Sequence, residues 1–144
     1  MTNSLFATFA IVAGIAAALQ ATVNAALAKQ TGLGVALIIN TVVVLIGSIV
    51  LWAASGAKMS FFPAGTSWTL YLGGIGGLVI IATLAFVFPR IGAAYAVALM
   101  VAGQCATALL IDHYGWLGMP YEALTLQRVL GVALVIAGAV TMRL

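Results

Sequence analysis

Amide side chains are the chemical groups that stand out in the interior of this sequence. Gln20, Asn24, Asn40 and Gln104 all lie within long stretches that contain no charged residue. Gln20 and Asn24 are four residues apart and so share one helix face, and Met100 lies in line with Gln104 on another. Because a polar group in an apolar layer needs a partner, we expect this set to contact a bound solute. The alternative is that the amides join helices by bonding to one another.

A second set of candidate residues lies at the edges of the uncharged stretches. Asp112 and His113 follow one such stretch directly, and Glu122 and Arg128 precede the next. Two interpretations of Arg128 remain open: its side chain reaches out to lipid phosphate groups, or it pairs with Asp112 or Glu122 and acts as a gate. We expect any gating or energy coupling to use these four residues.

Groups needed for other kinds of chemistry are missing. No Asp, Glu, Lys or His lies in the middle of an uncharged stretch, so an embedded carboxylate that exchanges a proton for a cation is excluded. The single Cys105 has no His nearby in the sequence, which argues against an enzyme and against a metal site. We therefore expect no catalytic residue, no metal and no cofactor, and a neutral, zwitterionic or ring-bearing solute.

The elements that position these residues follow from composition. Of 144 residues, 65% are hydrophobic and 5% are charged, which excludes a soluble domain and predicts an all-α integral membrane protein. The apolar runs lack the alternation of a barrel, so they are expected to be helices. The net charge of +3 comes from scattered basic residues with no patch for nucleic acid. Five spans are expected in one membrane domain of residues 1–144, at about residues 5–28, 35–54, 68–88, 93–111 and 120–142.

The fifth span is the least regular of the five. Its apolar core, residues 129–142, is too short to cross a layer of ~30 Å, so we extend the predicted helix back to Pro120, which suits a first helical turn. With five spans, Lys29, Arg90 and Arg143 fall on one side, and Lys58 and Arg128 on the other. This near balance of charge weakly favours a cytoplasmic carboxyl terminus and permits insertion in both orientations.

The working unit is expected to be larger than one chain. Five spans leave little room for a water-filled cavity, and many small transporters are built from two inverted halves. We therefore expect an antiparallel homodimer of ten helices, with a parallel dimer or a sister chain as alternatives. Gly73, Gly74, Gly76 and Gly77 give the third span a face of small residues, which we expect to pack within the monomer.

Two stretches of the chain carry a family resemblance. Residues 118–144, GMPYEALTLQRVLGVALVIAGAVTMRL, resemble the closing helix of the drug/metabolite transporter superfamily. The matching residues there are Pro120, Glu122, Gln127, Arg128, Gly131, Ala137, Gly138 and Val140. Residues 89–112 resemble the preceding helix, and Gly103 and Gln104 followed by DHYGWLGMP resemble the half-size YdcZ-type branch.

The resemblance implies a half-transporter of five spans, with fused relatives of ten, that works by alternating access. The small multidrug members have an essential Glu in the first span, where this chain has Gln20 and Asn24, so proton-coupled cation export does not carry over. We expect a multi-pass transporter of small organic solutes in the inner membrane, in contact with lipid. A non-transporting assembly partner or scaffold, a narrow channel and one half of a heterodimer are the rival interpretations.

Overall fold

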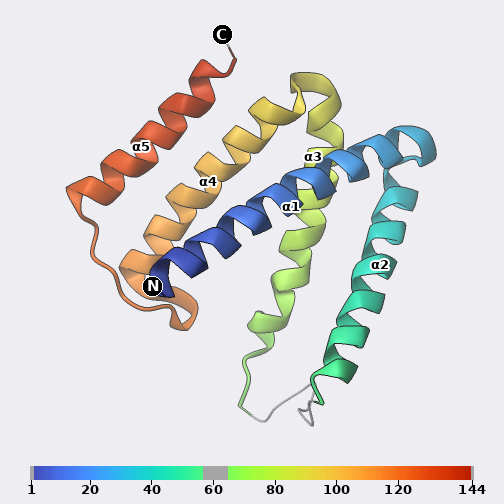
Figure 1. Cartoon of the computed structure of the whole chain (residues 1–144), viewed down its shortest axis with the longest axis horizontal. Coiled ribbons are helices and arrows are strands. Elements are labelled where there is room, and N and C mark those ends of the chain that lie inside the picture. The colour runs from blue at the N-terminus through green and yellow to red at the C-terminus, as the bar shows by residue number, and fades with distance from the viewer. Residues whose placement is uncertain (1, 57–64, 144) are drawn as a thin grey trace. The chain divides into compact units, whose positions relative to one another are not determined.

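The computed structural model describes residues 2–56 and 65–143, and within them the regular elements are helices (Figure 1). The α-helices are α1 (Thr2–Thr31), α2 (Leu33–Ala54), α3 (Gly73–Ile91), α4 (Ala93–Tyr114) and α5 (Leu126–Thr141). Short 3-10 turns, η1 (Trp68–Leu72) and η2 (Trp116–Gly118), precede α3 and follow α4. Lys58, which entered the charge balance, lies outside the described residues.

Four of the predicted spans are confirmed as helices that are long and apolar enough to cross a membrane. They cover Ser4–Thr31, Leu33–Ala54, Trp68–Ile91 and Ala93–Tyr114. Each has 22 or more residues, and at about 1.5 Å per residue that length matches a hydrocarbon layer of about 30 Å. The described residues therefore agree with an all-α membrane protein, with a shorter apolar helix at the carboxyl end.

The fifth helix begins later than predicted. Pro120 was expected to start it, but α5 begins at Leu126 and has 16 residues, or about 24 Å. Thr125 is its N-cap, and the Thr125 hydroxyl oxygen accepts a hydrogen bond from the Arg128 backbone N–H at 3.3 Å. Upstream, the Glu122 N–H donates to the Asp112 carbonyl oxygen at 2.9 Å. The segment before Thr125 is therefore tied to the end of α4 and is not helical.

The fourth helix ends later than predicted. It was expected to stop at Ile111, but it continues to Tyr114 and ends at Gly115, whose φ of 60° is left-handed. The Gly115 N–H donates to the Asp112 carbonyl oxygen at 3.3 Å and closes the helix. Asp112 and His113 therefore lie in the last turn of α4 and are not part of the loop.

Two glycine corners of the same geometry connect consecutive helices. Gly32, between α1 and α2, has φ 86° and ψ 155°, and Gly92, between α3 and α4, has φ 83° and ψ 152°. This region of backbone conformation is open essentially only to glycine. Each glycine carbonyl accepts a hydrogen bond of 3.2 Å from the residue four positions on, Ala36 or Ala96. Both alanines are buried, at 2% and 3% exposed.

The chain separates into two compact units, Met1–Pro89 and Arg90–Leu144. In the first unit, α1 and α2 form a hairpin whose arms diverge from the Gly32 corner (Figure 1). In the second unit, α4 packs against α5. The single domain expected from the sequence stays a prediction.

Few side chains are buried, and most of the buried ones are small. The buried apolar residues are Ala21, Ala25, Ala36, Leu84, Ala85, Phe88, Ala96, Ala102 and Ala139. By contrast, residues 4–17 of α1 are exposed along their whole length, including Phe6 and Phe9 at 66% and 61%. Small residues let helices approach closely. The contacts of α1 with α2 and of α4 with α5 therefore bury mainly alanines. The rest of the apolar surface is left for lipid or for another chain.

The glycine face of the third helix makes no close contact with the rest of its unit, as far as the structure describes that unit. Outside the neighbouring residues and the backbone of α3 itself, a Cβ atom added at Gly73, Gly74, Gly76 or Gly77 would meet no described atom within 4 Å. The first turns of α3 therefore present bare backbone to their surroundings. The expected packing of this face within the monomer stays a prediction.

Candidate functional site

Three of the predicted amides form one cluster in the first unit. The Asn40 Oδ1 accepts a hydrogen bond from Gln20 Nε2 at 3.3 Å and another from Asn24 Nδ2 at 3.1 Å. Gln20 and Asn24 are one helical turn apart on α1, and Asn40 faces them from α2. Asn24 is 7% exposed and is the one buried polar residue among those that the structure describes. We call Gln20, Asn24 and Asn40 the amide cluster.

The amide cluster lies well inside the length of its helices. Asn40 is seven residues from Leu33, the start of α2, which is about 10 Å along the helix. Gln20 is eleven residues before Thr31, the end of α1, which is about 16 Å. A helix that crosses a hydrocarbon layer of about 30 Å would hold residues at these distances from its end inside that layer. Polar groups are costly there unless they are paired.

A groove of about 460 Å³ opens beside the amide cluster in the first unit. Gln20, Asn40 and Thr41 supply its polar groups. The α3 side of the groove includes Gly74 and Gly77, where bare backbone takes the place of side chains. The remaining lining residues are Leu37, Val44, Leu78, Ile80 and Ile81. No residue of the lining is charged, and the volume falls within the range of small-molecule sites, about 300–1,000 Å³.

The other two predicted binding residues lie on α4, in the second unit. Met100 is partly buried and Gln104 is exposed. Neither belongs to the lining of the groove beside the amide cluster. Their contact with a solute stays a prediction, and α1 and α2 supply the amides that are brought together.

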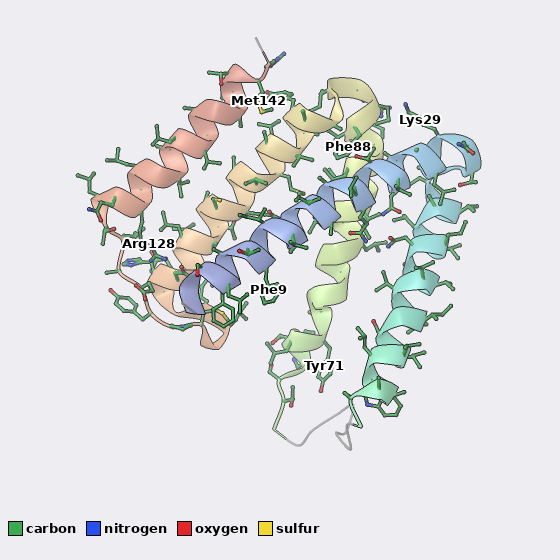
Figure 2. The ribbon with its side chains drawn as sticks, viewed as in Figure 1. Phe9, Lys29, Tyr71, Phe88, Arg128 and Met142 are labelled. Atoms are coloured by element: carbon green, nitrogen blue, oxygen red, sulfur yellow. The ribbon has the colours of Figure 1, made fainter. Side chains whose placement is uncertain are left out.

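The charged residues at the span edges also gather, in the second unit. An Arg128 Nη2 donates to Asp112 Oδ2 at 2.6 Å, and each of the two side chains is 34% exposed. Arg128 Nη1 also donates to the Glu122 backbone carbonyl oxygen at 3.3 Å. Figure 2 shows Arg128 at the start of α5, directed toward the end of α4. Of the two interpretations of Arg128, the structure shows the ion pair with Asp112.

His113 lies next to this ion pair among aromatic rings. Its ring centroid is 5.0 Å from that of Tyr114 and 6.0 Å from that of Tyr121. His113 Nδ1 is buried and has no hydrogen-bond partner among the described residues. His113 therefore lies beside aromatic rings, and among the described residues its side chain makes no hydrogen bond or ion pair with Asp112 or Arg128.

A second groove, of about 310 Å³, includes the ion pair in its lining. It runs along α4 and α5, and Cys105 forms part of its wall. The remaining lining is apolar and consists of Ala108, Leu109, Gly131, Val132 and Val135. Arg128 and Asp112 can lie beside this apolar surface because each charge is paired with the other, which offsets the cost of removing an isolated charge from water.

Some contributions to these sites were missed by sequence reasoning. Glu122 acts through its backbone N–H and carbonyl, which carry no residue-specific signal. Thr125 caps α5, and a Thr just before an apolar run is a helix-start signal that could have placed this end correctly. Thr41 lies one residue after Asn40 and was not singled out, because the sequence alone does not show which residues line a groove.

The comparisons with known proteins identify the family. The chain matches, over residues 5–141, the family described as "Putative inner membrane exporter, YdcZ". No curated protein and no solved structure matches it. The match spans all five helices from within α1 to the last residue of α5. This description supports a transporter in general. The chain thus belongs to the YdcZ-type branch of the drug/metabolite transporters and is a multi-pass protein of the inner membrane.

Proposed function

We propose that this protein exports small organic solutes through a site formed at the amide cluster. The observation that carries the proposal is the uncharged groove whose lining includes Gln20 and Asn40. Both residues lie well inside the apolar lengths of α1 and α2. Amides placed there can bind a solute by hydrogen bonds while the apolar walls exclude water. The inner-membrane exporter family supports the direction of transport.

The proposed working unit is an antiparallel homodimer that operates by alternating access. Support comes from the exposed apolar surface of residues 4–17 and from the bare glycine backbone of α3. Lipid could cover the first surface, but the open groove between α1, α2 and α3 needs a further wall to enclose a solute. A second, inverted copy would supply that wall, and the near balance of basic residues permits its insertion.

Solute flux in proteoliposomes tests the transport function. Asn40→Leu should abolish most of the flux of a transported solute, whereas Gln30→Leu, an amide change at the exposed end of α1, should leave it intact. Equal flux in both variants would return the amide cluster to a purely structural role. A protein that assembles and carries none of a broad panel of neutral and zwitterionic solutes would be the scaffold of the rival interpretation.

Orientation in the membrane tests the antiparallel dimer. In a Cys105→Ala background, single cysteines are placed at Thr31, the exposed last residue of α1, and at Tyr121, in the exposed connection before α5, on opposite sides of the predicted spans. Insertion in both directions should leave each of them open to an impermeant thiol reagent in about half of the chains of intact cells. Complete labelling of one site and none of the other would eliminate a homodimer of this kind, and would leave a sister chain as the partner.

The ion pair between α4 and α5 is the proposed gate, with His113 and Glu122 beside it. It fastens the start of α5 to the end of α4 by a side-chain contact and by the Glu122 backbone. A Cys105→Ala protein carrying Asp112→Cys and Arg128→Cys can be locked there with a bifunctional methanethiosulfonate reagent, whose arm takes the place of the long Arg side chain, since a direct disulfide needs the two Cα atoms within about 7 Å. Flux should stop on cross-linking and return on reduction. Flux that continues through the cross-linked protein would show that this contact does not need to open.

A further inference from the structure

We infer that the groove beside the amide cluster selects an uncharged nitrogen heterocycle that presents an N–H donor next to a C=O acceptor on one edge, as in cyclic amides and imides. The inference rests on the proposed function for its biological use, since it names the class of solute that the same site takes. Three features of the groove lead to it: its free hydrogen-bonding groups, its lack of charge and its glycine wall.

The free hydrogen-bonding groups follow from the pairing inside the amide cluster. Both internal bonds end on one atom, Asn40 Oδ1, which leaves the two N–H groups of Asn40 Nδ2 without a partner among the described residues. The Gln20 oxygen is likewise left without one there. Since Gln20 and Asn40 both line the groove and Asn24 is buried behind them, the groove offers amide donors and an amide acceptor.

This pattern does not depend on how the amide groups are oriented. If all three amides are turned over together, Asn40 Nδ2 donates to Gln20 and Asn24 with its two N–H groups, and the two distances are equally well satisfied. The groove then offers the Asn40 oxygen and the Gln20 amino group. In either arrangement one donor group and one acceptor face a ligand, so the complementary ligand also carries one of each.

The absence of charge in the lining excludes an ionic ligand. None of the ten lining residues is charged, and the amide cluster lies about 10–16 Å from the helix ends. An ion brought to this depth without a counter-charge loses hydration worth several kcal/mol that amides do not replace. An uncharged donor and acceptor, by contrast, lose only hydrogen bonds to water that the amides restore.

The glycine wall favours a flat ligand. Gly74 and Gly77 lie one turn-spacing apart on α3 and line the groove, and a Cβ at either would meet nothing within 4 Å. The α3 wall thus has bare backbone at these two places, and Leu37 and Val44 line the groove from α2. A planar ring can lie against bare backbone more closely than a branched chain does. The edge recognition has a known counterpart, because Asn and Gln side chains bind the donor and acceptor edge of adenine with two hydrogen bonds.

Direct binding to the purified full-length protein tests the inference with uracil as the probe. Uracil carries adjacent N–H and C=O groups, and 1,3-dimethyluracil keeps the ring and both carbonyls but has no donor. We expect saturable uracil binding in equilibrium dialysis, with affinity for 1,3-dimethyluracil at least about tenfold lower, the loss expected for one to two hydrogen bonds. Equal affinity for the two ligands, or no uracil binding, overturns the inference.

Variants then place the binding at this groove. Asn40→Leu and Gly77→Val should each weaken uracil binding by about tenfold or more, the first by removing the donor and acceptor and the second by covering the bare backbone. Gln30→Leu and Gly103→Val are matched controls on exposed positions outside this lining and should bind as the unchanged protein does. Should Asn40→Leu fail to fold, Gly77→Val and the methylated ligand still decide the question. Uracil binding that survives Gly77→Val overturns the inference.

Flux measurements separate this inference from the proposed function. If charged or zwitterionic solutes cross the membrane through the protein while uracil neither binds nor competes, the transporter stands and the inference fails. If uracil binds with the expected preference but no solute crosses, the ligand class stands and the proposed function fails.

Discussion

Asn40 takes part in both hydrogen bonds of the amide cluster, whereas Gln20 and Asn24 take part in one each. Substitutions at Asn40 and at Asn24 should therefore change the free energy of unfolding by different amounts. Asn40→Leu removes both bonds, each worth about 0.6 kcal/mol between membrane helices. It also leaves the Asn24 amide, which is 7% exposed, without its partner, at a cost of about 1 kcal/mol. The sum is a loss of about 2 kcal/mol in the free energy of unfolding.

Asn24→Leu should behave differently although it breaks one of the same bonds. The buried amide disappears with the bond, and Asn40 Oδ1 still accepts from Gln20 Nε2. We expect a change within about 0.5 kcal/mol of zero, because an apolar side chain replaces a buried polar one. In the double variant with Asn40→Leu, no unpaired Asn24 remains, so the double variant should be more stable than Asn40→Leu alone by about 1 kcal/mol.

Reversible unfolding in mixed micelles of mild detergent and dodecyl sulfate, followed by far-UV circular dichroism, measures all three variants. Thr22→Ala serves as the control, since the Thr22 hydroxyl donates to the Ala18 carbonyl within the same helix and does not join α1 to α2. The reasoning would be refuted if Asn24→Leu were as destabilising as Asn40→Leu, or if the double variant were less stable than both single ones.

Three further predictions concern the second unit. Asp112→Asn should lower the free energy of unfolding by about 0.5–1 kcal/mol, the value of a partly exposed ion pair, and should make that free energy less sensitive to salt. Glu122→Gln should change neither, because Glu122 contacts Arg128 through its backbone. Equal effects of the two substitutions in a salt titration would contradict this. Gly92→Ala should cost about 1–3 kcal/mol because its φ of 83° suits glycine, and Gly103→Ala, inside α4 with no atom within 4 Å, should be neutral or stabilising in the same unfolding assay. Thr125→Val should cost about 1 kcal/mol and reduce helical ellipticity if the hydroxyl caps α5, and an unchanged spectrum and midpoint would argue against the cap.

The sequence predicted the elements better than their ends and their pairing. Long uncharged stretches sufficed for four helices, since spanning length and hydropathy are local properties. The end of α4 and the start of α5 were misplaced although local signals mark both, since Gly115 closes α4 and Thr125 caps α5. The bond from the Glu122 N–H to the Asp112 carbonyl is different, because it joins residues ten positions apart whose proximity no periodic pattern reveals.

The amide cluster was predicted only in part for a similar reason. The spacing of Gln20 and Asn24 correctly placed both on one face of α1. That Asn40 faces them depends on the Gly32 corner, which fixes how α2 turns back along α1. Gln104 looked equivalent from its depth in the sequence, yet it lies on α4, in the other unit, and is exposed.

The two glycine corners lie 92 minus 32, or 60, positions apart, and a shift of 60 also brings other features into register. The 22-residue helices that follow them coincide from first residue to last, and the buried Asn24 and Ala25 fall on the buried Leu84 and Ala85. Under the same shift Gln20 and Asn40 fall on Ile80 and Met100. The chain therefore repeats a backbone plan without repeating its polar groups: one of the two matched segments carries the three amides, and its counterpart has apolar side chains at the same places.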